Sequence, residues 1–533
     1  MISLEAEETY DRMAKGTAWQ EQAMFQGRKA FFLFCFFLFV FSRKVTTPEK
    51  KNASSSSFAE MVSKALLVCL FFLSLSHRSN SLGTESTTAP SLEGCGRVLA
   101  IHLPGAPSHL NLMLTVSKRL YERGHHVLLL LEQNDYGTSA SMLQKAGIPV
   151  LAYDTGYTEK EWREGARSLR FSGSTSSMMT GFQVWGAQTD MILRNESLIQ
   201  SIREFAPSLV LGDFTFLAST ALSQVLSVPQ VALSCAPLAD PPHSNILSFP
   251  NPLSTVPQFG SNLTLPMTAS DKVWNIFTWA KTGVFFKKVI GEVFQPVLRS
   301  HGLSMRAPTA VIVNTDWSLD WPRSLPPHVK YIGPLLASAV PEDKAALAAP
   351  FGGQPFVVAS LGTLAALSAT EYRTVARGLS MLSPVKVLWK VSSDDLPEGL
   401  SIRNLKEVAS ENVEIVERFA QNEILAGRGA LGFFTHGGIN SIYEAAFHGV
   451  PIVALPLIGD QLDNVNKAIS KGFAERVGLP LSPENVFGPL QKILNNPVYK
   501  TNAQKLSFAL QNKYLSPLDE AAAAIESVIK DQR

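Results

Sequence analysis

The sequence contains little cysteine and little charge. Four cysteines in 533 residues, none in a CxxC or Cys/His spacing, exclude a disulfide scaffold and a structural zinc site. Two of them, Cys95 and Cys235, lie in the main body and could pair or stay free. Charged residues make up 17%, and 47 Lys and Arg against 45 Asp and Glu leave a formal net charge of +2. This balance creates no general attraction for nucleic acid, so we expect no nucleic-acid partner.

Long apolar runs are also absent. No run reaches the roughly 18 residues of a membrane-spanning helix, so we expect the main body not to thread through a bilayer. Hydrophobic residues nevertheless make up 46%, which fits a packed globular chain. At about 150 residues per domain, the length allows three or four domains.

The amino end carries two short apolar runs, at residues 30–42 and 65–76. Each has the length of a signal-peptide core. The second run follows Met61 and ends in small and polar residues, so we interpret Met61 as the biological start and residues 1–60 as an upstream extension. The alternative is that one run stays attached as a membrane anchor. Both interpretations direct the chain to the secretory pathway, to the endoplasmic reticulum lumen or to secretion.

The rest of the chain alternates apolar strands with helices. RVLAIHLP from residue 97 predicts a strand, LNLMLTVSKRLYERG a helix that ends at Gly124, and HHVLLLLEQ the next strand. A second series starts at PFVVASLGT and continues through KVLWKV, ALGFFTH and VPIVALP. Nearly continuous apolar strands between helices are typical of parallel sheets that are buried on both faces. The predicted fold class is α/β.

Composition changes along the chain predict five segments. These are an amino-terminal extension with signal or anchor segments (1–94), a first α/β domain (95–335), a linker rich in Pro, Ala and Gly (336–355), a second α/β domain (356–500) and a helical carboxyl-terminal segment (501–533).

The most informative segment is LGFFTHGGINSIYEAAFHGVP at 431–451. A strand, a Gly-Gly turn and a short helix let backbone N–H groups approach an anion, and the helix terminus favours phosphate there. His436 and Ser441 could each add a hydrogen bond. The alternative is an ordinary strand-to-helix turn in which Ser441 and Glu444 form a capping box.

From Arg418 to Gln461, the stretches RFAQNEIL, FFTHGGINSIYEA and HGVPIVALPLIGDQLDN closely resemble the donor-binding signature of the UDP-glycosyltransferase family. SLGT at 360–363 resembles the family's first donor-domain loop, and WSLDWPR at 317–323 is similar to its animal branch. The resemblance spans about residues 97–530. It implies a GT-B fold of two facing Rossmann-like domains, with acceptor in the first and UDP-sugar in the second. It also implies an inverting transfer that needs neither metal nor cofactor, because the UDP-sugar is a co-substrate.

The resemblance implies a UDP-sugar site of ten residues. The diphosphate-contacting turn is matched by His436, Gly438, Asn440 and Ser441, and its partner on the SLGT loop is matched by Thr363. The ribose-binding acid is matched by Glu444, and the nucleoside contacts are matched by Gln421 and Arg418. The contacts to the sugar hydroxyls are matched by Asp460 and Gln461. Arg418 stands where the family usually has a Trp that stacks on uracil, and a guanidinium plane can also stack on a base.

The resemblance also implies a catalytic dyad. His109, just after the first strand, matches the family's general base, and its ordinary pKa near 6.5 suits proton removal at neutral pH. Asp213, at the end of SLVLGD, matches the carboxylate that orients this histidine. The arrangement is similar to a Ser-His-Asp triad with the acceptor hydroxyl in place of the serine. The alternative is a loop histidine and a strand-end aspartate with capping duties.

The expected function is therefore hexosyl transfer from UDP-glucose or UDP-glucuronate to a hydroxyl of a small lipophilic acceptor. The alternative is a GT-B protein that binds a nucleotide sugar without transferring it. Animal members of the family usually end in a transmembrane helix, whereas this chain stops at IESVIKDQR. We therefore expect a protein that is soluble in the lumen or secreted, or one that associates with the membrane through its amino-terminal apolar segments.

The aromatic run from Trp274 to Phe286 has three interpretations. It could line an apolar acceptor pocket, rest on a membrane or belong to the core. Core is the default for such a stripe.

Overall fold

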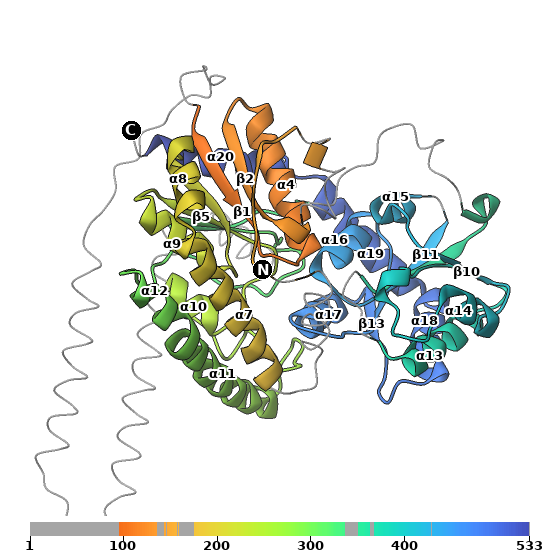
Figure 1. Ribbon diagram of the computed structural model, residues 1–533. Helices are drawn as coiled ribbons and strands as arrows, with labels where there is room; N and C mark the ends of the chain where they lie inside the picture. Colours follow the sequence, from red (N-terminus) through yellow and green to blue (C-terminus); the bar gives the residue numbers. More distant parts are fainter. Residues whose placement is uncertain are drawn as a thin grey trace, which may run out of the picture. The chain divides into compact units, whose positions relative to one another are not determined.

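The computed structural model describes most of the chain after the amino-terminal runs, which lie outside the described residues together with Thr363 (Figure 1). The described residues are 95–135, 143–144, 147–156, 158, 175–335, 350–362, 367–427 and 429–531. None of the helices within them is long and apolar enough to cross a membrane. In this part of the chain Cys95 and Cys235 do not form a disulfide with each other.

The amino half contains a seven-stranded parallel sheet in the order β3-β2-β1-β4-β5-β6-β7. Its strands are β1 (Arg97–Ile101), β2 (His126–Glu132), β3 (Val150–Tyr153), β4 (Leu209–Asp213), β5 (Gln230–Ser234), β6 (Ala310–Val313) and β7 (Val329–Tyr331). Its helical segments are α4 (Pro107–Glu122), α7 (Thr175–Arg194), α8 (Glu196–Phe205), α9 (Leu217–Val225), α10 (Pro242–Leu247), α11 (Ala269–Val289), η1 (Ile290–Phe294) and α12 (Gln295–Ser300).

The carboxyl half contains a six-stranded parallel sheet in the order β10-β9-β8-β11-β12-β13. Its strands are β8 (Phe356–Ser360), β9 (Lys386–Lys390), β10 (Val413–Val416), β11 (Ala430–Thr435), β12 (Ile452–Ala454) and β13 (Ala474–Arg476). The helical segments from here to the end are η3 (Pro350–Gly353), α13 (Ala369–Ser380), η4 (Ser393–Asp395), α14 (Ile402–Val408), α15 (Gln421–Ala426), α16 (Ile439–Phe447), α17 (Gln461–Ser470), α18 (Pro483–Asn495), α19 (Pro497–Gln511) and α20 (Pro517–Lys530).

The central strands of both sheets are buried on both faces, as their continuous apolar sequence predicts. On β1, Val98 and Ala100 enter one hydrophobic cluster, whereas Leu99 and Ile101 enter another on the opposite face of the sheet. This alternation follows from the two-residue period of a strand. The prediction of an α/β fold with two parallel-sheet halves is confirmed.

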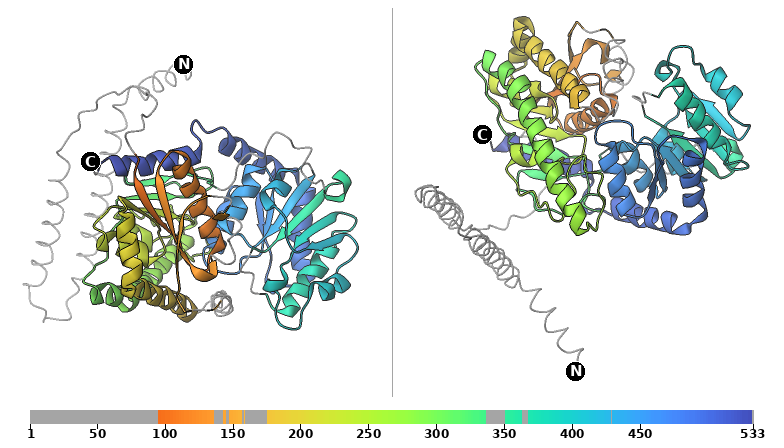
Figure 2. Two further views of the ribbon diagram at one scale, coloured as in Figure 1. Left: turned by 45° about the horizontal axis from the view of Figure 1, so that its top comes forward. Right: turned by 90° about the horizontal axis from the view of Figure 1, so that it is seen from below.

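Helix α20 returns to the amino half after the carboxyl half is complete. It packs beside α4, and its residues Ala521, Ile525 and Ile529 are part of the hydrophobic cluster on one face of the amino-half sheet (Figure 2). Helix α19, just before it, packs against α16 in the carboxyl half. The last helix of the chain therefore completes the core of its first domain.

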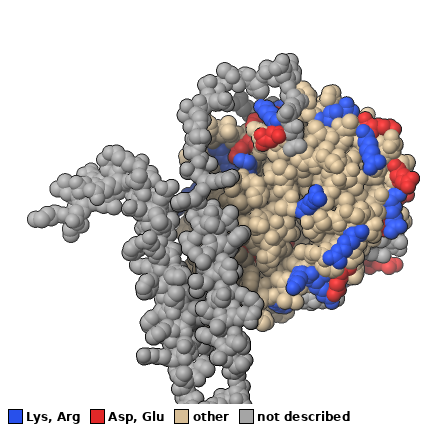
Figure 3. All heavy atoms as spheres, turned by 90° about the vertical axis from the view of Figure 1, so that its left-hand side faces the viewer, with Lys and Arg blue, Asp and Glu red and all other residues tan. Residues whose placement is uncertain are grey.

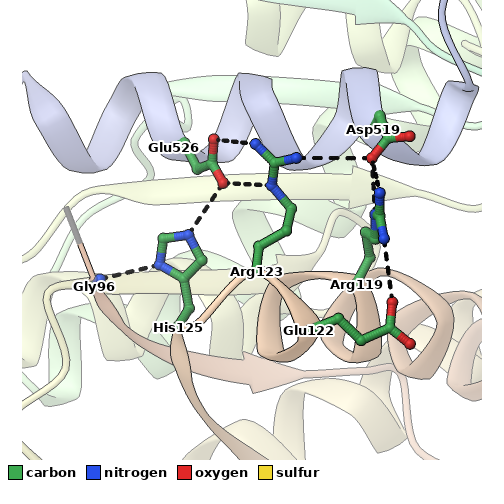
Figure 4. Close-up of polar contacts among 7 residues, drawn as sticks. All are labelled: Gly96, Arg119, Glu122, Arg123, His125, Asp519 and Glu526. Atoms are coloured by element: carbon green, nitrogen blue, oxygen red, sulfur yellow. Dashed lines mark hydrogen bonds and ion pairs between the residues drawn. The ribbon is translucent and has the colours of Figure 1, made fainter. Parts of the chain in front are cut away.

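Ion pairs hold α20 against α4 (Figure 4). Arg123 donates two hydrogen bonds to Glu526, at 2.6 and 2.9 Å, and Arg119 Nε donates to Asp519 at 2.8 Å. The backbone N–H of Gly96 donates to His125 Nδ1 at 3.0 Å. Because Nδ1 accepts, the ring proton of neutral His125 is on Nε2, which lies 3.2 Å from Glu526.

We expect Glu526→Gln to weaken this attachment. The hydrogen bonds from Arg123 are the first cause that lowers the pKa of Glu526 below its usual value. A lowered carboxyl pKa stabilises the folded state above the unfolded-state pKa, and this contribution is lost as the pH falls through the folded-state pKa. The variant should reduce the opening free energy of α20 by about 1–2 kcal/mol, measured by native-state hydrogen exchange at neutral pH.

The matched control is Glu407→Gln. Glu407 pairs with Arg403 at 3.4 Å, but the two side chains are 61% and 89% exposed, so the substitution should leave exchange in α20 unchanged. The difference between wild type and Glu526→Gln should shrink as the pH falls below about 4. An equal effect of the two substitutions would contradict a role for the α4–α20 ion pairs.

Candidate active site

The predicted functional residues cluster where the strand order of each sheet reverses. In the amino half this point lies between β1 and β4, and in the carboxyl half between β8 and β11. Ligands of open α/β sheets bind at the carboxyl ends of strands at such a switch point. His109 follows β1 and Asp213 ends β4, whereas His436 follows β11. Topology therefore singles out the same positions as the sequence motifs.

His109 and Asp213 form a direct hydrogen bond. His109 lies in the first turn of α4, and its Nδ1 is 2.6 Å from Asp213 Oδ2. An ionised carboxylate only accepts, so the proton is on Nδ1, and Nε2 of the neutral ring is left with a free lone pair. The other carboxylate oxygen accepts the backbone N–H of Thr215 at 2.8 Å. Asp213 is buried, and the His109 side chain is 21% exposed.

The electrostatics of this pair favour the imidazolium–carboxylate state. Burial lowers the pKa of His109, but the nearby Cys235 sulfur and Asp213 carboxylate raise it, and the resulting pKa lies well above 6.5. Burial alone would raise the pKa of Asp213, whereas the His109 charge lowers it below its usual value. Burial also raises the pKa of the Cys235 thiol to about 11, so this thiol is neutral at pH 7. We therefore assign the stabilising negative charge to Asp213.

Cys235 immediately follows β5, and its sulfur lies 3.8 Å from Asp213 Oδ2. Among the described residues, one group of side chains is close enough to hold a metal ion, and it consists of His109, Asp213 and Cys235, with ligand atoms within 4.8 Å of one another. The absence of a metal requirement stays a prediction.

In the turn after β11, glycines allow the backbone to lie very close to the His436 ring. A Cβ on Gly438 would lie 2.5 Å from His436 Nε2, and a Cβ on Gly362 would lie 2.7 Å from the same ring. The imidazole thus lies between two glycines, one on each of the loops that follow β8 and β11. Burial and then the charge of Lys390 lower the pKa of His436 to about 4, so the ring is neutral at pH 7.

Gln421 joins two other predicted donor residues. Its side-chain NH₂ donates to Ser441 Oγ at 3.1 Å and to Glu444 Oε2 at 2.5 Å. Helix α16 starts after Gly438 without a side-chain cap, so the alternative of a Ser441–Glu444 capping box is wrong. Burial raises the pKa of Glu444, although the hydrogen bond from Gln421 acts against this rise. The structure brings together three residues of the predicted UDP-sugar site: the nucleoside contact Gln421, the ribose-binding Glu444, and Ser441 of the diphosphate-contacting turn.

Lys390 is a neighbour of this cluster that the sequence motifs do not mark. It ends β9, and its Nζ lies 5.8 Å from the centre of the Phe419 ring. Burial lowers the pKa of Lys390, whereas the charges of Asp395 and Glu444 act in the opposite direction. The sequence signal that could have marked Lys390 is its position directly after the apolar run of KVLW. Arg418, predicted to stack on a base, is exposed.

Asp460, Gln461 and Asn440 already have protein partners. Asp460 Oδ2 accepts from Asn464 Nδ2 at 2.8 Å. The Gln461 side-chain carbonyl accepts the backbone N–H groups of residues 457 and 458 at 2.7 and 3.0 Å, which leaves its NH₂ as the group for a ligand. Asn440 Oδ1 accepts from Asn314 Nδ2 at 3.1 Å, so an amino-half residue contacts the donor turn.

Three further contacts fix the donor helices to the amino half. The Tyr443 hydroxyl lies 2.7 Å from Thr315 Oγ1 and accepts the backbone N–H of Asp316 at 2.6 Å. On α17, Lys467 forms a buried ion pair with Asp320 at 2.6 Å. Asp320 belongs to the WSLDWPR motif, so this motif joins the two halves.

The model of the family "UDP-glucoronosyl and UDP-glucosyl transferase" matches residues 96–532. The chain belongs to this family. UDP-glycosyltransferases transfer sugar from a UDP-sugar, and membership supports this activity for the chain. The predicted resemblance is confirmed.

Curated relatives agree with the assignment. The chain is 28% identical to the 2-hydroxyacylsphingosine 1-beta-galactosyltransferase of Mus musculus, with 79% of this chain and 78% of that protein covered. It is 27% identical to UDP-glucuronosyltransferase 2B7 of Homo sapiens, with 82% and 84% covered.

Solved structures support the GT-B fold. The chain is similar to Os79 from O. sativa in complex with U2F and trichothecene, with a TM-score of 0.59, 20% identity, and coverage of 81% of this chain and 100% of that chain. It is also similar to CalG4, the calicheamicin glycosyltransferase, with a TM-score of 0.55, 17% identity, and coverage of 82% and 98%.

We predict that Glu444→Ala weakens UDP binding by about 1–3 kcal/mol, the range for hydrogen bonds to a charged group. The physical reason is the loss of a buried carboxylate that can accept from vicinal hydroxyls. Isothermal titration calorimetry with UDP measures the effect, and Glu407→Ala on the exposed helix α14 is the control. An unchanged UDP affinity would remove Glu444 from the donor site.

Proposed function

We propose that the chain is an inverting glycosyltransferase that moves a hexosyl group from a UDP-sugar to a hydroxyl of a small lipophilic acceptor. The observation that carries this proposal is the 2.6 Å hydrogen bond between His109 and buried Asp213 at the switch point of the amino-half sheet. Family membership supports the UDP-sugar as donor.

His109 is the general base of the proposed reaction. Nε2 accepts the acceptor O–H proton while the oxygen attacks the anomeric carbon of the sugar. The bond from that carbon to the UDP oxygen breaks, and UDP leaves with the bonding electrons. Asp213 holds the ring through Nδ1–H and stabilises the imidazolium that forms. Attack from the side opposite to UDP inverts the anomeric centre.

The proposed donor site is at the switch point of the carboxyl half. Gln421 and Glu444 bind the nucleoside side, whereas the His436–Gly438 turn, the start of α16 and the Ser441 hydroxyl bind the diphosphate. The positive charge of Lys390 beside this cluster favours the negatively charged diphosphate. The structures of Os79 in complex with UDP, to which the chain is similar, support the same class of ligand here.

The acceptor class rests on the names of the relatives. One relative is named for a 2-hydroxyacylsphingosine acceptor, and the relatives include both galactosyl- and glucuronosyltransferases. We therefore propose a lipophilic hydroxyl compound as the acceptor. The transferred sugar that we propose is glucose, glucuronate or galactose. We also propose that the enzyme works in the lumen of the secretory pathway, which amino-terminal sequencing of the lumenal or secreted product would test.

The overall reaction is tested by UDP release. The full chain is incubated with UDP-glucose, UDP-glucuronate or UDP-galactose, each with and without a panel of phenolic and sphingoid acceptors. Release that depends on both sugar and acceptor supports transfer. Binding of a UDP-sugar without acceptor-dependent release would support the alternative of a nucleotide-sugar-binding protein.

We predict that His109→Ala lowers transfer by about 10²–10⁴, the usual cost of losing a general base, with UDP affinity unchanged. The base must be neutral, so wild-type kcat/KM should rise with pH through the raised pKa of His109. Asp213→Asn removes the charge that raises this pKa. The variant should therefore be slower, and its rising limb should move to lower pH. A rising limb that stays at the same pH in Asp213→Asn would contradict the pairing of Asp213 with His109.

A further inference from the structure

Helix α11 presents apolar side chains to the outside of the protein. Val273, Phe277 and Val284 are 70%, 56% and 71% exposed, and Trp274 is 50% exposed. The default expectation that the run from Trp274 to Phe286 belongs to the core is therefore wrong for most of the helix. Toward its carboxyl end the run is half-buried, where aromatic rings of α11 pack on α7.

In the first half of α11, the buried side chains are polar instead. Asn275 is fully buried, and its side chain donates to the backbone carbonyls of Leu253 and Val256 at 2.8 Å and accepts the backbone N–H of Gln258 at 2.7 Å. Thr278 is also buried. These hydrogen bonds fix the rotation of the helix about its axis. A surface helix normally buries its apolar side, whereas the first half of α11 buries Asn275 and Thr278 and exposes apolar side chains.

Lysines flank the apolar face on both sides. With 3.6 residues per turn, Val273, Phe277 and Val284 form the centre of the outer face. Exposed lysines follow each border of this stripe: Lys281 and Lys288 on one border, Lys272 and Lys287 on the other.

Acidic side chains are rare around this stripe. The acid of the first turn, Asp271, closes the capping box with Thr268. Beyond the helix, Glu292 lies 3.7 Å from Lys288. Figure 3 shows one face of the molecule, on which basic and acidic side chains are set in a largely uncharged surface.

We propose that the outer face of α11 rests in the interface of a bilayer that contains anionic phospholipids. An apolar stripe with tryptophan and flanking lysines is the pattern of a helix that lies in the membrane plane. Lysine side chains extend to the headgroups while the stripe enters the acyl boundary. Trp274 donates its indole N–H to Ser261 O at 3.0 Å, so its polar group is satisfied while its ring stays half exposed.

The lysines of α11 disfavour a second copy of the chain as the partner that covers its outer face. A two-fold contact places the same face on both partners, so the lysine borders of one α11 would meet those of the other. The anionic headgroups of a bilayer instead complement all four lysines. This attachment is separate from the amino-terminal apolar runs, and it does not depend on the transfer reaction.

The test uses the full chain with a reporter on the helix itself, because the amino-terminal runs could bind vesicles independently. Cys35, Cys69 and Cys95 are replaced by Ser, Cys235 stays because it is buried, and Val284→Cys carries an environment-sensitive fluorophore. Vesicles of phosphatidylcholine with phosphatidylserine should shift the emission to the blue, and phosphatidylcholine alone should do so much less. A Leu479→Cys reporter, at an 80% exposed site in the other half, is the control.

Charge removal gives the second arm. Lys281→Gln/Lys288→Gln should raise the lipid concentration at half-maximal shift by at least about tenfold, since each lysine near an anionic surface contributes about fivefold. Lys406→Gln on α14 should leave the shift unchanged, and circular dichroism checks folding of every variant. An unshifted Val284 reporter on vesicle-bound protein would overturn the proposal. A blue shift that depends on protein concentration without lipid would overturn it in favour of self-association.

Discussion

Parallel pairing of β1 with β4 is the constraint on which the amino-half site depends. The pairing sets Ile101 opposite Gly212, so the two chains leave the sheet at the same edge. His109 and Asp213 are 104 residues apart in sequence and meet only because of this register. A shift of one residue would turn Asp213 toward the other face of the sheet. The buried carboxylate then gains its hydrogen bond from imidazole, which offsets the cost of burying its charge.

The sequence predicted the parts of the fold that follow from local patterns. Apolar runs gave the central strands, and the Gly-Gly turn after β11 gave the start of α16, because strand burial and glycine turns depend on neighbouring residues. The resemblance to a family supplied His109 and Asp213. Local pattern could not reveal that Ser441 and Glu444 bind Gln421 instead of capping a helix, because that choice depends on the first residue of α15, which is 20 positions away from Ser441. The short strands β3, β7 and β13 are also too brief to leave a clear period.

Lys390 and α11 show a second limit of sequence reasoning. A lysine after an apolar strand has no motif, and its closeness to the donor turn follows only from the strand order of the sheet. On α11, aromatic spacing predicts an apolar stripe but does not say which way it faces. The direction is set by Asn275, whose three hydrogen bonds to the 253–258 segment depend on tertiary structure.

The return of α20 means that the chain passes between the two halves twice, once after β7 and once between α19 and α20. Two bodies joined at one point can turn in any direction, whereas two bodies joined at two points turn chiefly about the line through both. Opening and closing of the halves around bound ligands would then be restricted to one hinge axis. The same topology delays completion of the first domain during synthesis, since its core lacks Ile525 and Ile529 until the whole second domain has been translated.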